Sequence, residues 1–162
     1  RRIEALDRYV ALPLLLIEDE HFGRIRRNHY GRLGEARTQR WGFEYRTPSS
    51  WLIDPDIAKG VLATAYTVVN ELVNHHPQTI IPRGFTEEAY SQVRRPTLKP
   101  ILREAYEEIK GMILYPKYKK AIDKFYRRAL RGETWDERQD VWKAWLSPKV
   151  IERQGRVRRR PH

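Results

Sequence analysis

Cysteine is absent from the chain, which excludes disulfide bonds and thiolate–metal sites and suits a reducing cytosol. Long hydrophobic runs are absent as well. The longest, Tyr9–Ile17, has nine residues, whereas a membrane-spanning helix needs about 20. Acidic residues follow this run directly, which is unlike a secretory signal. These absences predict a protein without a membrane partner.

Charged residues are abundant and mostly basic. The 162 residues include 32 Lys and Arg against 21 Asp and Glu, for a formal net charge of +11. This balance favours a polyanionic partner such as nucleotide phosphates, nucleic acid or an acidic protein surface, although the same charge also serves solubility. A chain of this length can bury about two-thirds of its unfolded surface in one domain. We predict that domain over 1–150, followed by a basic tail over 151–162 that nucleic acid could bind.

Apolar residues recur at helical spacing in much of the chain. The segment 3–17 is apolar nearly all round and should be a buried helix, with Pro13 kinking or ending it early. Asp54 and Pro55 begin a second helix, because aspartate caps a helix and proline suits its first turn. Its predicted apolar stripe consists of Ile57, Val61, Leu62, Ala65, Val68, Val69, Leu72 and Val73.

Three more helices are expected in the second half of the chain. The first two cover about 97–114 and 117–131, and the third begins at about 134 and is stopped by Pro148. Gly132 should stop the second of these, and a capping box at 134–137 should open the third. The tryptophans of this region are expected in the core rather than as a stacking platform; they are Trp135, Trp142 and Trp145.

The segments between these helices are predicted to be irregular, apart from one strand. Residues 21–40 are rich in arginine and glycine and are expected to be irregular, while 41–47 alternates and is predicted as a strand. The connector 77–96 is expected to hold at most a short helix at 87–93. A single strand is not stable alone, so strands from another segment or chain should pair with it. The predicted fold class is helix-rich α+β, with one clear strand and four to five helices.

The most informative pattern lies between residues 26 and 51. Glycines alternate with basic residues there, in Tyr30-Gly31-x-x-Gly34-x-x-Arg37. Glycine lets the backbone approach a ligand closely while guanidinium groups grip phosphate or carboxylate. Glu44 and Arg46 leave the predicted strand on the same face, where they could hold a metal and an anion together, as phosphoryl transfer requires. The plainer interpretation is a salt bridge beside a solvated basic loop.

The order of these features, more than any single motif, resembles a known family. Leu6-Asp7, an apolar helix, paired arginines, the glycine–arginine motif, the run Gly42–Thr47, a tryptophan and the proline-started helix follow one another. This order resembles the phage carboxylate–amine ligases, the amidoligase group of the glutamine synthetase superfamily. The resemblance covers roughly 1–75 and is densest at 26–51. It implies the C-terminal part of a glutamine-synthetase-like ligase fold, with the site in 21–54 and a helical part in 55–150.

The resemblance also implies an ATP- and magnesium-dependent reaction. A carboxylate would be activated as an acyl phosphate, which an amine then attacks to form an amide or peptide-like bond. Glu44 would bind Mg²⁺, and Arg37 and Arg46 would be catalytic, with Arg46 on the substrate carboxylate or the γ-phosphate. The residues that would grip the ATP phosphates or shape the loop around them are Arg27, Tyr30, Gly31 and Gly34. The setting would be the cytoplasm of a host cell or a virion.

The sequence departs from the family in its acidic residues. The family also uses acidic residues and a His-x-His strand from a preceding segment, and the chain, which starts at Arg1 rather than methionine, contains no His-x-His. Glu44 alone is a poor start for magnesium, which takes about six oxygen ligands. We therefore expect a fragment, a half completed by a missing N-terminal segment or a partner chain, or a degenerate copy with a structural role.

Two alternatives complete the expectations. The pairs His75-His76 and Asp54/Asp56 should serve helix ends rather than bind metals. The alternative function is a basic virion or nucleoprotein component that binds nucleic acid or a protein through the arginine-rich loop and tail. A ligase needs Arg37, Glu44 and Arg46 to converge on one cleft, whereas a binding protein needs its arginines spread over an exposed face.

Overall fold

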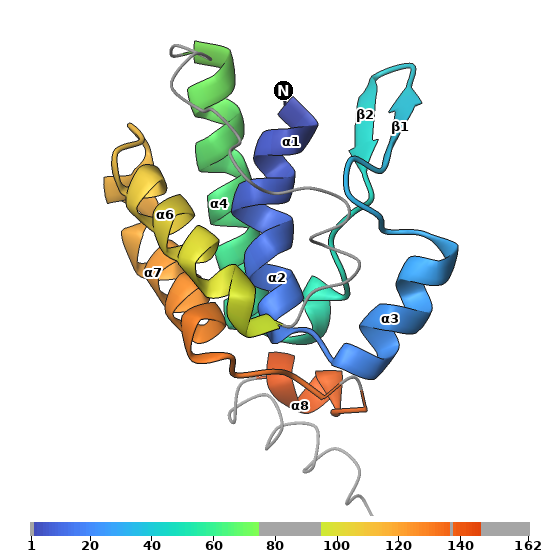
Figure 1. Ribbon diagram of the computed structural model, residues 1–162. Coiled ribbons are helices and arrows are strands. Elements are labelled where there is room, and N and C mark those ends of the chain that lie inside the picture. Colours follow the sequence, from blue (N-terminus) through green and yellow to red (C-terminus); the bar gives the residue numbers. More distant parts are fainter. Residues whose placement is uncertain (1, 75–94, 137, 147–162) are drawn as a thin grey trace, which may run out of the picture.

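The computed structural model describes residues 2–74, 95–136 and 138–146, which form a helical bundle with a small hairpin beside it (Figure 1). The helix-rich α+β class is confirmed, since within these ranges helices dominate and the sheet has two strands. The predictions for His75-His76, for the tail and for most of the connector 77–96 lie outside the described residues. None of the described helices is long and apolar enough to cross a membrane.

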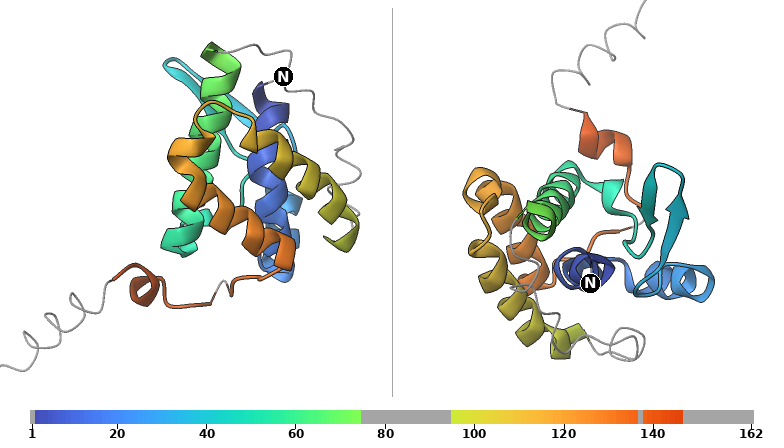
Figure 2. Two further views of the ribbon diagram at one scale, coloured as in Figure 1. Left: turned by 90° about the vertical axis from the view of Figure 1, so that its left-hand side faces the viewer. Right: turned by 90° about the horizontal axis from the view of Figure 1, so that it is seen from above.

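The N-terminal segment is one continuous helix in the interior of the bundle. It comprises α1 (Arg2–Leu6), a π-helical turn η1 (Asp7–Ala11) and α2 (Leu12–Ile17), and every side chain over 5–17 is buried. This confirms the predicted buried helix. The other helices surround it on several sides (Figure 2), because a helix that is apolar all round is stable only when it is enclosed.

Pro13 does not end this helix early. The disturbance appears instead as the π-helical turn before it, where the Leu12 N–H reaches back to the carbonyl of Asp7. Proline has no N–H to offer the carbonyl four residues earlier, which is that of Tyr9. The buried hydroxyl of Tyr126, from a later helix, donates to this oxygen at 2.8 Å and replaces the missing donor.

Helix α4 (Pro55–Asn74) begins where the sequence predicts. Asp54 Oδ1 accepts the N–H groups of Asp56 at 2.8 Å and Ile57 at 3.1 Å, which confirms the aspartate cap. The predicted apolar stripe, however, is divided, because its eight residues span too wide an arc for one packed face. The buried members are Ile57, Val61, Val68 and Leu72, and the exposed ones are Leu62, Val69 and Val73.

Two further helices, α6 (Lys99–Lys110) and α7 (Tyr115–Arg131), complete the bundle after a short 3-10 turn η3 (Arg95–Leu98). α6 ends before the predicted residue 114. α7 ends as predicted at Gly132, whose φ of +72° lets its N–H turn back to the carbonyls of the last helical turn. α4 and α7 pack closely at Gly60, where an added Cβ would collide with Phe125.

The last described helix, α8 (Val141–Trp145), begins later than the capping box predicts, with Asp140 as its cap. Before this helix the Trp135 N–H donates to the carbonyl of Ile17 at 2.9 Å, and the Gln139 N–H donates to the carbonyl of Asp136 at 3.0 Å. Trp135 is in the core as predicted. Placing all three tryptophans there was wrong, since Trp142 and Trp145 are 75% and 44% exposed.

The basic segment 21–40 is not irregular throughout, which corrects the prediction. Its first part is α3 (Glu20–His29), capped by Asp19, and its last part is strand β1 (Ala36–Gln39). β1 pairs antiparallel with β2 (Gly42–Tyr45), the predicted strand. A partner strand therefore comes from the segment just before β2, which was missed because its residues lack apolar alternation.

The replacement of the Pro13 donor by Tyr126 predicts a specific coupling. Tyr126→Phe leaves a buried carbonyl unpaired and should lower the free energy of unfolding by about 1–3 kcal/mol. Pro13→Ala restores a backbone N–H, so in that background the same change should cost about 1 kcal/mol less. Urea unfolding of the four proteins of this double-mutant cycle measures the difference. Strictly additive effects would contradict the assignment.

Candidate active site

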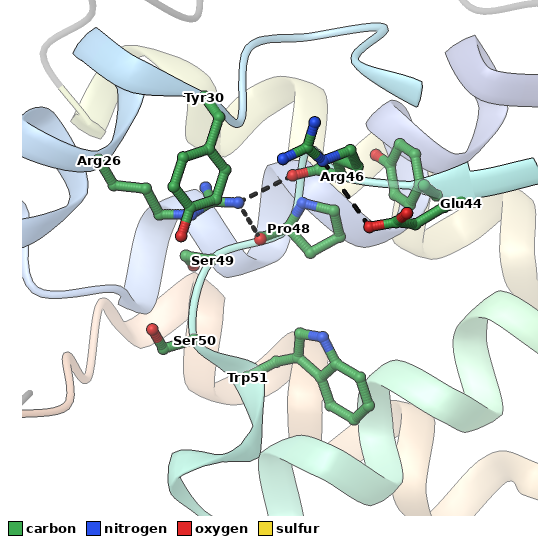
Figure 3. A pocket seen from close by; sticks show the side chains of 9 residues that line it. Arg26, Tyr30, Glu44, Arg46, Pro48, Ser49, Ser50 and Trp51 are labelled. Atoms are coloured by element: carbon green, nitrogen blue, oxygen red, sulfur yellow. Dashed lines mark hydrogen bonds and ion pairs between the residues drawn. The ribbon is translucent and has the colours of Figure 1, made fainter. Parts of the chain in front are cut away.

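Arg26, on α3, fixes the chain that leaves β2. Its guanidinium donates to the carbonyl oxygens of Arg46 at 2.8 Å and Thr47 at 3.0 Å, and also to that of Pro48 (Figure 3). One side chain thus satisfies three consecutive carbonyls. Thr47 is fully buried and its hydroxyl donates to the carbonyl of Arg32 at 2.8 Å. These bonds hold the segment after β2 against α3 and the loop.

The glycine loop between α3 and β1 is closed by two carboxylates. Gly31 and Gly34 have φ of +88° and +73°, a region that side chains disfavour. Glu35 accepts the N–H groups of Gly31 and Arg32, and Asp7 accepts that of Gly34 at 2.7 Å. Gly31 and Gly34 therefore shape the loop, but their N–H groups are occupied by protein carboxylates.

Arg37 and Glu44 face each other across the hairpin. The register pairs them directly, and Arg37 donates to Glu44 Oε2 from Nη2 at 2.7 Å and from Nε at 3.1 Å. These hydrogen bonds hold the pKa of Glu44 below its ordinary value. Both side chains are partly exposed, at 61% and 41%. The pair orients the Glu44 carboxylate and contributes little to stability.

Arg46 lies between two carboxylates. Its Nε is 3.8 Å from Glu44 Oε1 and its Nη1 is 3.5 Å from Glu35 Oε1. Glu44 and Arg46 therefore share one face of the strand, as the spacing predicts. The ring of Tyr30 lies over this group, with its centroid 5.6 Å from the Arg46 guanidinium carbon and 4.7 Å from that of Arg26. Arg46 keeps 36% of its side chain exposed.

These side chains border an open pocket of about 350 Å³. Its size suits a small ligand rather than a protein segment. One lining atom, the buried hydroxyl oxygen of Ser49, has no hydrogen-bond partner within the described part of the chain. The lining residues are Arg26, Tyr30, Glu44, Tyr45, Arg46, Pro48, Ser49, Ser50 and Trp51 (Figure 3).

The predicted site residues are only partly brought together. Tyr30, Glu44 and Arg46 line the pocket, and Arg37 holds Glu44 without lining it. Arg27 is directed elsewhere: it pairs with Glu18, whose side chain is 1% exposed. Its neighbour Arg26 occupies the site instead.

Several residues of this site were not predicted. Arg26 belongs to the basic segment, but the sequence did not show that Arg26 rather than Arg27 enters the pocket. That choice depends on α3 being a helix, in which neighbouring side chains point about 100° apart. Ser49 and Trp51 also line the pocket, and Glu35 lies 3.5 Å from Arg46, which lines it. The sequence signal for Glu35 is its place directly after the glycine loop.

The donor set offers a weak basis for a metal ion. Across 2–74, 95–136 and 138–146, no three or more His, Asp or Glu side chains come together as a metal site would require. Glu44 is already held by two guanidinium groups, and Glu35 by backbone N–H groups and Arg46. The described residues alone therefore do not fit the ligand set that Mg²⁺ prefers.

The charge of the site fits a single anion better. Three guanidinium groups, of Arg26, Arg37 and Arg46, are balanced by two carboxylates, of Glu35 and Glu44, which leaves one net positive charge. A half-exposed guanidinium beside an aromatic ring is suited to bind one carboxylate in a planar, bidentate manner.

The chain is similar to a known protein family. The family model described as phage phiEco32-like COOH.NH2 ligase-type 2 matches residues 1–146. The match spans the pocket and every described helix and strand. No curated protein and no solved structure matches the chain.

The pairing of Arg37 with Glu44 predicts a shift that can be measured. Arg37→Gln should raise the pKa of Glu44 towards its ordinary value, because the pKa is now held down by hydrogen bonds from Arg37. A carboxyl group with a depressed pKa stabilises the folded protein at pH values above its unfolded-state pKa. This stabilisation is lost as the pH falls through the folded-state pKa. Side-chain carboxyl NMR titration measures the change, with Arg24→Gln, on exposed α3, as the control. An unchanged Glu44 pKa in Arg37→Gln would contradict this account.

Proposed function

The chain belongs to the phage phiEco32-like COOH.NH2 ligase-type 2 family and is thus a carboxylate–amine ligase, and we propose that it uses ATP to activate the carboxylate. In this reaction the γ-phosphoryl group of ATP passes to a carboxylate oxygen, and ADP leaves. The amine nitrogen then attacks the acyl carbon and loses a proton, the bond to the phosphate oxygen breaks, and an amide remains.

The observation that carries the proposal is the position of Arg46. Its guanidinium lies in the pocket between Glu35 and Glu44, with Tyr30 over one side. Three groups thus fix its direction while more than a third of the side chain stays accessible. An arginine held in this way can bind the substrate carboxylate without losing much side-chain freedom on binding.

The surrounding residues have supporting roles in the proposal. Glu44 orients Arg46 and is itself oriented by Arg37, whose largely exposed guanidinium can meet the charge that develops on the transferred phosphoryl group. Arg26 keeps the wall after β2 in place. Arg27 is assigned no direct contact with ATP here, because it is engaged with Glu18.

In this proposal Glu44 is the only described residue assigned to Mg²⁺. Bound with ATP, Mg²⁺ would neutralise phosphate oxygens. Glu44 is the carboxylate of the pocket that could reach it, and the other ligands would be phosphate oxygens, water or side chains outside the described ranges. No step is assigned to the metal.

The test uses probes in place of the unidentified substrates. The full chain is incubated with ATP, MgCl₂, a mixture of the common amino acids as carboxylates and hydroxylamine as the amine, and both ADP and hydroxamate are measured. We expect matched amounts of the two products. Arg46→Gln should reduce their rate by roughly 10³-fold, the scale for an arginine that stabilises phosphoryl transfer. Arg24→Gln, which removes only an exposed pair with Glu20, is the matched control.

Several outcomes would contradict the proposal. The wild-type chain could release neither ADP nor hydroxamate, or Arg46→Gln could retain full activity. A Glu44→Ala protein with unchanged ATP turnover would remove this pocket from the reaction. Failure to bind ATP, combined with nucleic-acid binding that weakens steeply with salt, would favour the alternative of a polyanion-binding protein.

A further inference from the structure

Helix α4 has a second apolar face that no described part of the chain covers. Its opposite face packs into the core, yet between residues 62 and 73 four apolar side chains are exposed to solvent. Their exposed fractions are 58%, 56%, 39% and 57% for Leu62, Tyr66, Val69 and Val73. Helix α4 lies at the periphery of the bundle with α7 along one side (Figure 2), and of the four side chains Tyr66 also meets the ring of Tyr118 on α7.

The spacing of the stripe has the period of a helix–helix seam. Successive members are four, three and four residues apart, the alternation with which one helix packs knobs into the holes of another. A small, half-buried side chain, Ala65, flanks it on one side, whereas Ala63 on the other side is buried in the core. A small flanking residue lets a second backbone approach closely.

We propose that this stripe is a docking surface for an acidic amphipathic helix of another polypeptide. A helix is favoured over an extended segment because the stripe follows one line over residues 62–73, with steps of four, three and four residues. The apolar side chains supply the buried seam of the interface. The charges beside them select the partner.

The charge around the stripe is positive. Lys59 precedes Leu62 by one turn and continues the same seam. Lys117 lies over the ring of Tyr118 at 5.3 Å, and Tyr118 meets Tyr66 edge to face at 5.8 Å, so an ammonium group lies beside the seam. The nearby carboxylate of Asp56 is neutralised by Lys124 at 2.6 Å.

Acidic side chains beside the partner's seam therefore meet the ammonium groups of Lys59 and Lys117 here. Such pairs across an interface set partner choice and orientation. A second copy of the chain is a poorer occupant, because two molecules of formal net charge +11 repel each other.

The experiment uses a designed three-heptad helical peptide as the probe. It carries leucine at the two seam positions and glutamate at the flanking positions, which also prevents it from pairing with itself. Binding to the full chain is followed by fluorescence anisotropy. A matched peptide with lysine at the flanking positions should bind ~10-fold more weakly or not at all.

Protein variants locate the binding surface. Tyr66→Ser/Val69→Ser should abolish binding of the glutamate peptide and leave folding intact, since both side chains are exposed. Ile25→Ser, a comparably exposed apolar residue of α3, should leave binding unchanged. Circular dichroism and unfolding midpoints confirm that the variants fold.

Four results would overturn the proposal. They are the absence of glutamate-peptide binding, equal binding of the lysine peptide, a self-association in sedimentation velocity that Tyr66→Ser/Val69→Ser abolishes, and binding to vesicles of anionic phospholipid that the same variant abolishes. The third would identify a second copy as the occupant, and the fourth a lipid surface. Loss of ligase activity with intact peptide binding would leave this proposal standing and affect only the proposed function.

Discussion

The buried carboxylate of Asp7 joins the two parts of the molecule. It sits in the π-helical turn of the central helix, 5% exposed, and accepts the N–H of Gly34 and the hydroxyl of Tyr45 at 2.7 and 2.5 Å. One carboxylate therefore fixes both the glycine loop and β2 to the bundle. The next two residues, Arg8 and Tyr9, turn the other way and bind Glu108 of α6. Successive side chains of a helix point in different directions, so residues 7–9 can bind elements on different sides.

The pocket depends on this anchoring because its own ion pairs are individually weak. The pairs of Arg46 with Glu35 and Glu44 are long and partly solvated, and exposed pairs contribute about 0–1 kcal/mol. Their function is to set directions rather than to stabilise the fold. The nearly balanced charge also limits what the pocket can attract. A single carboxylate matches it, whereas a triphosphate would need further positive charge.

Local signals in the sequence predicted most of the bundle. The cap at Asp54, the stop at Gly132 and the period-two spacing of Glu44 and Arg46 each depend on a few neighbouring residues, and each is found in the structure. Elements defined by partners were missed. β1 has no apolar alternation of its own and exists because β2 pairs with it. The divided stripe of α4 likewise required knowledge of which helices lie beside it.

The site shows the same limit at the level of single side chains. The sequence singles out a cluster of arginines but cannot say which of two neighbours enters the pocket. Arg26 does so and Arg27 does not, because α3 is a helix that directs them to different sides. The role of Glu35 depends on the turn made by the two glycines before it. That the chain is a carboxylate–amine ligase was recognised from the order of motifs, since this order reflects the whole segment rather than one contact.

The bonds made by Arg26 also limit how far the small sheet can grow. The carbonyl oxygens of Arg46, Thr47 and Pro48 accept from one guanidinium, and Pro48 has no N–H to donate. The Arg46 N–H still donates to the carbonyl of Glu35, but the Arg46 carbonyl accepts from Arg26 and the Glu35 N–H turns to Arg32, so the pairing of the two strands stops where the pocket begins.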